Sequence, residues 1–283
     1  MAVFNMSGER LTTEEYWDSV YKEPQKKAFS LTKTVGDFLK KVFGSRIKNY
    51  SEYILWTNIY QKYLPKGKDL KILEIGSAPG WNLVKFHNVF GYAPYGIEYA
   101  PTGVEENRRR FRGAGLNPQN VIEADFFDDK LRLRYADYFD LVESGGFIEH
   151  FTDVSPVVAR HAALLKPGGT LIIIIPNFRG LNNKLFAFFN PEVLKMHNLE
   201  IMKLNNFRKT FSDLGLEEKY CNYYGTFNFG MFNTPQKGVK YWIHRFLIRF
   251  QVLLNILFIF VFGNRGCENR YFSPYLIYIG RKK

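Results

Sequence analysis

The spacing of apolar residues changes near residue 65 of this 283-residue chain. Before that point the apolar positions recur every three to four residues, as on one face of a helix. Residues 12–15 read Thr-Thr-Glu-Glu, the form of a capping box, and predict the start of a helix that carries Tyr16 and Trp17. Two more helices are expected over residues 35–44 and 51–64. Residues 1–64 are therefore predicted to form a helical cap.

From residue 70 onward, short apolar runs alternate with helical stretches. The runs end at glycine, proline or acidic residues and cover residues 71–75, 93–97, 120–124, 139–143, 169–176, 218–224 and 274–280. Such alternation predicts a mostly parallel sheet with helices on both faces. Residues 65–283 are thus expected to form one α/β domain with insertions at residues 177–211 and 225–270.

The first apolar run ends in a turn of small residues, Gly76-Ser77-Ala78-Pro79-Gly80, that leads into a helix. Small residues let a ligand approach the backbone, and a helix N-terminus offers free N–H groups to negative atoms. Glu98 ends the second run, where an acidic side chain can accept hydrogen bonds from both hydroxyls of a ribose. The dinucleotide pattern G-x-G-x-x-G is not met, because Trp81 stands in the third glycine's place.

With these landmarks the chain resembles the class I S-adenosylmethionine-dependent methyltransferases, from about residue 70 to residue 177 and again at the last strand. The family's motif E/D-x-G-x-x-x-G matches Glu74, Gly76 and Gly80, and its ribose-binding acid matches Glu98. The segment after strand four matches residues 140–151, and the LKPGG turn stands at residues 165–169. A different Rossmann-like nucleotide-binding protein is the alternative.

The resemblance implies a Rossmann-like, seven-stranded, mostly parallel sheet with an antiparallel last strand and a helical insertion between the last two strands. It also implies S-adenosyl-L-methionine as cofactor. The residues expected to bind it, directly or by shaping its site, are Glu74, Gly76, Ser77, Ala78, Gly80, Glu98, Tyr99, Asp125, Phe126, Glu143, Ser144, Tyr16 and Trp17. The N-terminal helix is expected to close over this site.

Glu149 and His150 follow the fourth strand, beside the expected position of the methyl group, and are predicted to begin a helix. A hydroxyl acceptor needs a base near the transition state, and histidine titrates near neutral pH. His150 is therefore the predicted base and Glu149 the second candidate, unless His150 only packs the helix. Quinone-ring O-methyltransferases share this pair but have an additional acidic residue where Gly146 stands, so no metal site is predicted.

Two other functions stay open. The turn from Gly76 to Trp81 also resembles that of ribosomal RNA 2′-O-methyltransferases, and a net charge of +12 favours a polyanionic partner. Those enzymes place an Asp after strand four, however, and residues 143–149 contain none, so nucleic acid is not the expected partner. A non-catalytic, cofactor-binding partner subunit is the other alternative. The expected acceptor is the hydroxyl of a small molecule, such as a sugar or a lipid- or isoprenoid-linked compound.

Residues 246–262 are mostly Leu, Ile, Val and Phe. In a helical projection, a narrow polar stripe comprises Lys240, His244, Gln251 and Asn255. The segment is expected either to lie on an anionic membrane surface or to pack on its own domain or on a second copy in a homodimer. Two separated cysteines and an N-terminus without an apolar signal predict a cytoplasmic protein. In the first of the two alternatives for the apolar segment, the protein is peripheral on the inner face of the membrane.

Overall fold

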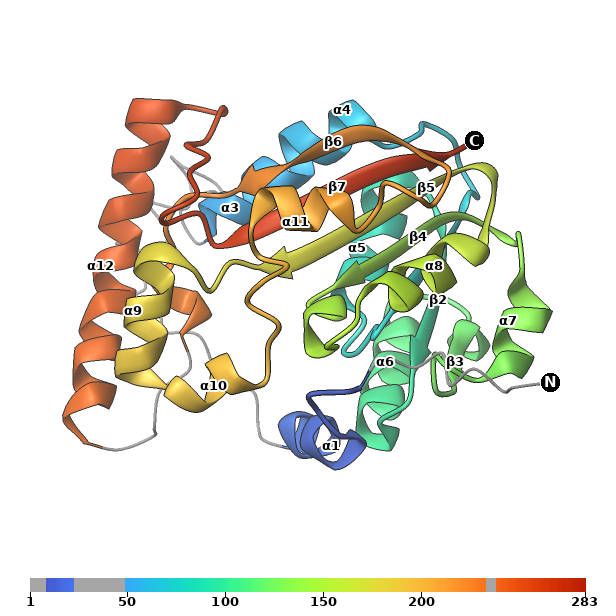
Figure 1. Cartoon of the computed structure of the whole chain (residues 1–283), viewed down its shortest axis with the longest axis horizontal. Helices are drawn as coiled ribbons and strands as arrows, with labels where there is room; N and C mark the ends of the chain where they lie inside the picture. Colours follow the sequence, from blue (N-terminus) through green and yellow to red (C-terminus); the bar gives the residue numbers. More distant parts are fainter. Residues whose placement is uncertain (1–8, 23–48, 233–237) are drawn as a thin grey trace.

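The computed structural model describes residues 9–22, 49–232 and 238–283. Its centre is a seven-stranded sheet with the order β3-β2-β1-β4-β5-β7-β6 (Figure 1). The strands are β1 (Lys71–Ile75), β2 (Ala93–Glu98), β3 (Val121–Glu123), β4 (Phe139–Gly145), β5 (Leu165–Pro176), β6 (Leu216–Tyr224) and β7 (Tyr275–Lys282). Strands β1 to β5 pair in parallel, whereas β7 lies antiparallel between β5 and β6. This topology confirms the predicted fold.

Both faces of the sheet are buried, because side chains alternate across each strand. Ile72, Leu141 and Ile172 point to one apolar cluster, and their chain neighbours Leu73, Val142 and Ile173 point to another. The first cluster is completed by η2 (Leu55–Ile59), α4 (Tyr60–Tyr63), α5 (Trp81–Phe90) and α6 (Pro101–Gly113). The second is completed by α7 (Asp129–Tyr135), α8 (Ser155–Ala163), α9 (Gly180–Phe189) and α11 (Leu204–Lys209).

The N-terminal helices are close to the predicted ones. The helix expected over residues 51–64 is the continuous run of α3 (Tyr50–Ile54), η2 and α4, and the one expected over residues 35–44 lies outside the described residues. The first helix, α1 (Glu14–Lys22), is capped by Thr13, whose Oγ1 accepts from Tyr16 N at 3.3 Å. Thr12, the first residue of the predicted capping box, does not cap the helix. Its side chain turns toward the interior, and its Oγ1 accepts a hydrogen bond from Trp17 Nε1 at 3.2 Å.

The chain has two helical insertions. The first follows β5 and contains α9, α10 (Pro191–Lys195) and α11. The second separates β6 from β7 and contains η5 (Phe229–Met231) and the long helix α12 (Val239–Phe262). Helices α9, α10 and α12 lie at the same end of the molecule, whereas α11 lies over the sheet (Figure 1). Of the helices in the described ranges, α12 alone has the length and composition to cross a membrane, and only 11% of its most apolar window is buried. Short 3₁₀ turns η3 (Pro118–Asn120) and η4 (Ile148–His150) complete the chain.

Candidate active site

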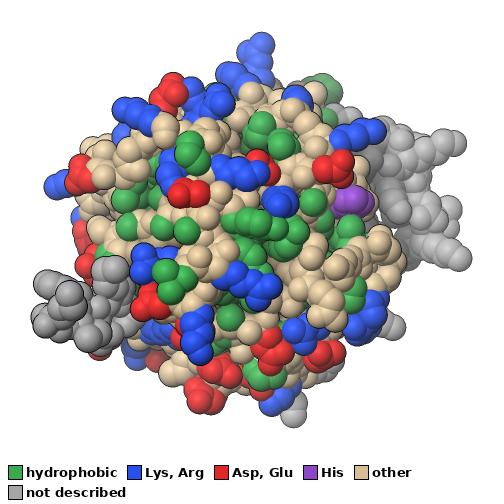
Figure 2. Space-filling model, turned by 90° about the vertical axis from the view of Figure 1, so that its right-hand side faces the viewer, with side chains coloured by type: hydrophobic (Ala, Val, Ile, Leu, Met, Phe, Trp, Pro, Cys, Tyr) green, Lys and Arg blue, Asp and Glu red, His purple; other side chains and the backbone are tan. Residues whose placement is uncertain are grey.

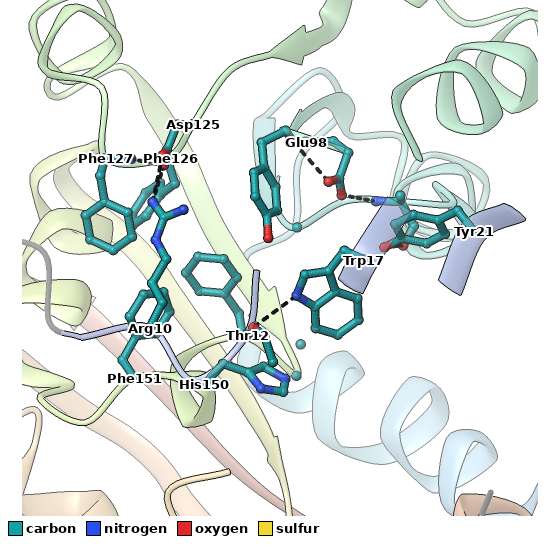
Figure 3. Close-up of a pocket in the computed structure, with 16 residues that line it drawn as sticks. Arg10, Thr12, Trp17, Tyr21, Glu98, Asp125, Phe126, Phe127, His150 and Phe151 are labelled. Atoms are coloured by element: carbon teal, nitrogen blue, oxygen red, sulfur yellow. Dashed lines mark hydrogen bonds and ion pairs between the residues drawn. The ribbon is translucent and has the colours of Figure 1, made fainter. Parts of the chain in front are cut away.

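A cavity of about 310 Å³ opens at the carboxyl ends of β1, β2 and β4 (Figure 3). In a parallel α/β sheet, this edge is where ligands bind. The volume is in the range of small-molecule sites. We call this space the first cavity.

The turn after β1 forms one wall of the first cavity through Gly76 and Ala78. Gly76 and Gly80 have φ angles of 68° and 85°, which favour glycine. A side chain at Gly80 would collide with the side chain of Asn107, which also donates a 2.6 Å hydrogen bond to Ser77 Oγ. The turn is closed by a 2.7 Å hydrogen bond from Gly80 N to Ser77 O. These contacts fix the backbone that faces the ligand.

Glu98 lies at the end of β2 with 3% of its surface exposed. Its Oε1 accepts from Tyr99 N and Ala100 N, both at 2.9 Å, and its Oε2 accepts from Ala78 N at 3.3 Å. Burial raises the pKa of Glu98, and these amides act against that shift. A carboxylate has about four lone-pair sites, so these three bonds leave acceptor capacity for a ligand hydroxyl.

Asp125 stands across the cavity from Glu98 (Figure 3) and is bound by Arg10. The Arg10 Nη2 atom donates to both carboxylate oxygens, at 2.7 and 2.6 Å, and Phe127 N donates to Oδ1 at 2.9 Å. The guanidinium also lies 4.9 Å from the centre of the Phe127 ring. The nearby wall is aromatic and contains Phe126, Phe127, Phe147 and Phe151. Such a wall suits a flat heterocycle.

Residues 9–22, which we call the N-terminal strap, roof the first cavity. Leu11 N donates to His150 O at 2.8 Å, and Thr152 N donates to Glu9 O at 3.1 Å. Further along, the Tyr21 hydroxyl donates to Ala78 O at 3.3 Å. The strap is thus attached to both sides of the cavity.

The sequence-predicted cofactor residues fall into three groups. The first cavity is lined by Trp17, Gly76, Ala78, Glu98, Tyr99, Asp125 and Phe126. Behind its wall, or outside the cavity, lie Glu74, Ser77, Gly80, Ser144 and Tyr16, whereas Glu143 lines a second cavity. Ser144, for example, lies 3.1 Å from Nε2 of the buried His161. The predicted base His150 also lines the first cavity. The lining residues that sequence reasoning missed are Arg10, Thr12, Tyr21, Phe127, Gly145, Gly146, Phe147 and Phe151.

The second cavity, of about 430 Å³, adjoins the first. Both are lined by Trp17, Gly145, Gly146 and His150. The remaining lining of the second cavity is acidic, amide-bearing and aromatic, with Glu52, Glu143, Glu149, Asn49, Asn82, Trp56, Tyr60, Tyr224, Tyr275 and His197 among its residues. No lysine or arginine of the described ranges lines it.

Glu149 and His150 belong to the 3₁₀ turn η4, so the prediction that they begin a helix is wrong. The helix begins five residues later, at Ser155, whose N–H donates to Asp153 Oδ1 at 3.1 Å. His150 and Glu149 are 6% and 1% exposed. Burial lowers the pKa of His150 to about 4 and raises that of Glu149 to about 8.

Two more carboxyl groups are buried side by side, since Glu74 on β1 pairs in register with Glu143 on β4. Glu143 Oε1 accepts from the Tyr60 hydroxyl at 3.0 Å, and Glu74 Oε1 accepts from Asn82 Nδ2 at 3.0 Å. The other oxygen of each has no hydrogen-bond partner among the described residues. Burial raises the pKa of both groups, to about 8 for Glu143.

Comparisons with known proteins agree with this geometry. Residues 73–173 match a family model described as a methyltransferase domain. No curated protein matches the chain in sequence.

Solved structures share the fold over nearly the whole chain. Geranyl diphosphate C-methyltransferase from Streptomyces coelicolor, solved with Mg²⁺, geranyl diphosphate and S-adenosyl-L-homocysteine, has a TM-score of 0.57 at 13% identity, covering 95% of this chain and 98% of that one. A putative sarcosine dimethylglycine methyltransferase from Galdieria sulphuraria has a TM-score of 0.54 at 17% identity, with coverage of 95% and 98%. A SAM-dependent methyltransferase from Archaeoglobus fulgidus has 0.53 at 17%, with coverage of 87% and 98%.

S-adenosylmethionine fits the first cavity by the chemistry of its lining. Glu98 has acceptor capacity for ribose hydroxyls, the phenylalanine wall suits adenine, and the turn at Gly76 leaves the backbone open to the rest of the molecule. Asp125 reaches the same space, with Arg10 already bound to it. The domain match, the fold and this lining together assign the cofactor.

Proposed function

We propose that this S-adenosylmethionine-dependent methyltransferase transfers its methyl group to a hydroxyl of a small polar molecule held in the second cavity. The observation that carries the proposal is the junction of the two cavities at Gly145, Gly146 and His150. Methyl transfer is an in-line displacement, so the acceptor has to lie next to the cofactor and be held in a fixed orientation. The second cavity meets that requirement.

The lining of the second cavity supports a polyhydroxylated acceptor such as a sugar. Carboxylates and amides of Glu52, Glu143 and Asn49 offer acceptors to hydroxyl groups, and the rings of Trp56 and Tyr275 offer apolar faces. The lack of a basic lining residue in the described ranges argues against a free phosphate in this cavity.

Glu149 and His150 line the second cavity, and in this proposal they handle the proton of the acceptor hydroxyl. With a pKa of about 8, Glu149 has a proton affinity close to that of an efficient base at neutral pH. His150, with a pKa of about 4, holds a proton poorly but can accept a hydrogen bond from the hydroxyl. In this proposal His150 therefore orients the acceptor, and Glu149 is the better proton acceptor of the two.

A second candidate acceptor is an amine. Carboxylates beside aromatic rings also suit an ammonium group, because cations are attracted to ring faces. The test is methyl-labelled S-adenosylmethionine offered with matched hydroxy and amino forms of sugars and small polyols. Label in the hydroxy forms supports the proposal. Label in the amino forms alone refutes it and favours N-methylation.

We also propose that α12 lies on an anionic membrane surface and that the acceptor is linked to a lipid. The C-terminal half of the polar stripe of α12 faces inward: Gln251 and Asn255 are 6% and 2% exposed, and Gln251 Nε2 donates to Phe227 O at 3.0 Å. The outward face carries Phe246, Leu253 and Phe260, which are 65%, 60% and 89% exposed. This polarity is the reverse of that of a helix on a water-exposed surface.

The charge of the protein bears on the choice between RNA and an anionic membrane. The face turned away from α12 mixes basic, acidic and hydrophobic side chains (Figure 2), so no uniformly basic surface for RNA lies there. A net charge of +12 still favours anionic lipids over neutral ones. The protein is accordingly proposed to work in the cytoplasm, at the inner face of the membrane.

Vesicle flotation tests the membrane proposal. The wild-type protein is expected to float with phosphatidylglycerol-containing vesicles, and the triple variant F246S/L253S/F260S is expected to stay behind. Leu133→Ser is the matched control, because Leu133 is 74% exposed on α7, at the opposite end of the sheet. Equal flotation of the wild type and the triple variant, or concentration-dependent dimerisation without vesicle binding, contradicts the proposal.

A further inference from the structure

His197, which sequence reasoning did not bring to the site, meets the predicted pair Glu149 and His150 in the second cavity. We propose that Glu149, His150 and His197 bind a divalent first-row transition-metal ion. One potential ligand atom from each residue lies within 4.8 Å of the other two, and the two imidazole ring centres are 4.4 Å apart. His197 lies between α10 and α11, some fifty residues after Glu149 and His150 in the chain.

In each of the two imidazoles, one nitrogen is hydrogen-bonded and the other is left to bind a metal. His150 Nδ1 lies 2.9 Å from Met196 O, and His197 Nδ1 lies 2.6 Å from Val193 O. A backbone carbonyl only accepts hydrogen bonds, so each Nδ1 carries the hydrogen and each Nε2 has the lone pair. Metal-bound histidines have this same arrangement, in which a bond to a carbonyl fixes the tautomer and orients the ring.

The carboxylate supplies an independent observation. Glu149 is 1% exposed, and its Oε2 atom has no hydrogen-bond partner among the described residues. A buried acceptor without a partner is costly, by about 1–3 kcal/mol and more when charged. A cation between Glu149 and the two imidazoles removes this cost.

The segments that carry the three ligands are tied to one another. Asn198 N donates to Glu149 O at 2.7 Å, and Asn198 Nδ2 donates to Phe151 O and Thr152 O at 3.1 Å each. The His197 ring also packs against Phe178 in a T-shaped arrangement, with 4.7 Å between the ring centres. The ligands are therefore positioned before an ion arrives, as a metal site requires.

The donor set indicates the class of ion. Two imidazole nitrogens and one carboxylate oxygen suit Zn²⁺, Fe²⁺, Mn²⁺ or Co²⁺, whereas Mg²⁺ and Ca²⁺ prefer oxygen ligands alone. Three protein ligands leave coordination positions open, and the site lines the cavity in which the acceptor is proposed to bind. With an ion bound, the Nε2 lone pair of His150 is occupied, so the ion itself, as a Lewis acid on the acceptor oxygen, would take over from His150 the role of orienting the acceptor. That role rests on the proposed function, but binding of the ion does not.

The binding test uses the full chain without a histidine tag, freed of metal by chelation. Calorimetric titration with Zn²⁺ and visible absorption with Co²⁺ are expected to show one equivalent bound. Glu149→Gln and His197→Gln are each expected to weaken binding 10-fold or more. His87→Gln is the matched control, because His87 Nδ1 also lies 2.9 Å from a carbonyl, Tyr92 O, but outside both cavities. Binding of S-adenosyl-L-homocysteine by each variant reports that it is folded.

The outcomes separate this site from the proposed function. No ion bound by the wild type, or an unchanged affinity in a folded His197→Gln variant, overturns the site. Stoichiometric binding that is weakened in both Glu149→Gln and His197→Gln but not in His87→Gln supports it, even where no hydroxyl acceptor is methylated. Hydroxyl methylation by a protein that binds no ion supports the proposed function and overturns the metal site.

Discussion

Replacing Glu143 with glutamine tests the electrostatics of the buried strand ends. Glu143 is 2% exposed, with Glu74 beside it on β1 and one oxygen held by the Tyr60 hydroxyl. Burial raises its pKa from 4.5 to about 8. Glutamine keeps the shape of the side chain and can still accept from Tyr60, but it does not titrate.

The size of the effect follows from linkage between protonation and folding. The folded protein binds this proton more tightly than the unfolded chain, so the stabilisation is fully present below pH 4.5 and is lost as the pH rises through about 8. A rise of the pKa by one corresponds to about 1.4 kcal/mol. The rise from 4.5 to about 8 therefore corresponds to a loss of about 4–5 kcal/mol in the free energy of unfolding above pH 8. Relative to the wild type, Glu143→Gln should therefore gain about 1 kcal/mol per pH unit from pH 5 to 8.

The assay is urea unfolding of both proteins at pH 5, 6, 7 and 8, with linear extrapolation to water. Glu105→Gln is the control, because the Glu105 side chain is 67% exposed on α6 and its substitution should leave the pH dependence unchanged. A difference between Glu143→Gln and wild type that stays constant over this pH range refutes the reasoning. It would mean that Glu143 is as well solvated in the folded protein as in the unfolded chain.

Three further predictions concern the first cavity. Glu98→Ala should weaken binding of S-adenosyl-L-homocysteine by about 1–3 kcal/mol, because it removes a buried charged acceptor; calorimetry checks this, and unchanged affinity would exclude Glu98 from the ribose site. Gly80→Ala should destabilise the fold by about 1–3 kcal/mol, since it combines a left-handed φ of 85° with a collision at Asn107; a wild-type melting temperature would contradict it. Arg10→Ala should change the free energy of unfolding by less than about 1 kcal/mol, because the Arg10 and Asp125 side chains are 33% and 46% exposed; a larger loss in urea unfolding would show that the strap supports the whole domain.

The strands could be predicted from the sequence because each has a local pattern. All seven apolar runs became strands, and the predicted order of landmarks placed Glu98 and Asp125 at the same sheet edge. Boundaries shifted where pairing reached beyond the apolar run. For example, β5 begins at Leu165, which pairs with Phe139, and not at residue 169.

The parts of the site that sequence reasoning missed depend on contacts between distant residues. Arg10 meets Asp125 across 115 positions of the chain, and His197 meets His150 across a stretch that contains α8, β5, α9 and α10. No periodicity or motif in the sequence predicts such pairs. The polar stripe of α12 was visible in the sequence, but its inward direction depends on two hydrogen bonds of Gln251. Its Nε2 donates to Phe227 O, and its Oε1 accepts from Phe229 N.

Trp17 forms part of the wall of both cavities, and the strap that carries it is fastened at Leu11 to His150. Any movement that lifts this tryptophan to release spent cofactor also uncovers the acceptor's side of the wall. If the acceptor binds in the second cavity as proposed, the exit of spent cofactor along that route would remove part of the acceptor's wall at the same time. The exchange of the two ligands would then be coupled through this one side chain.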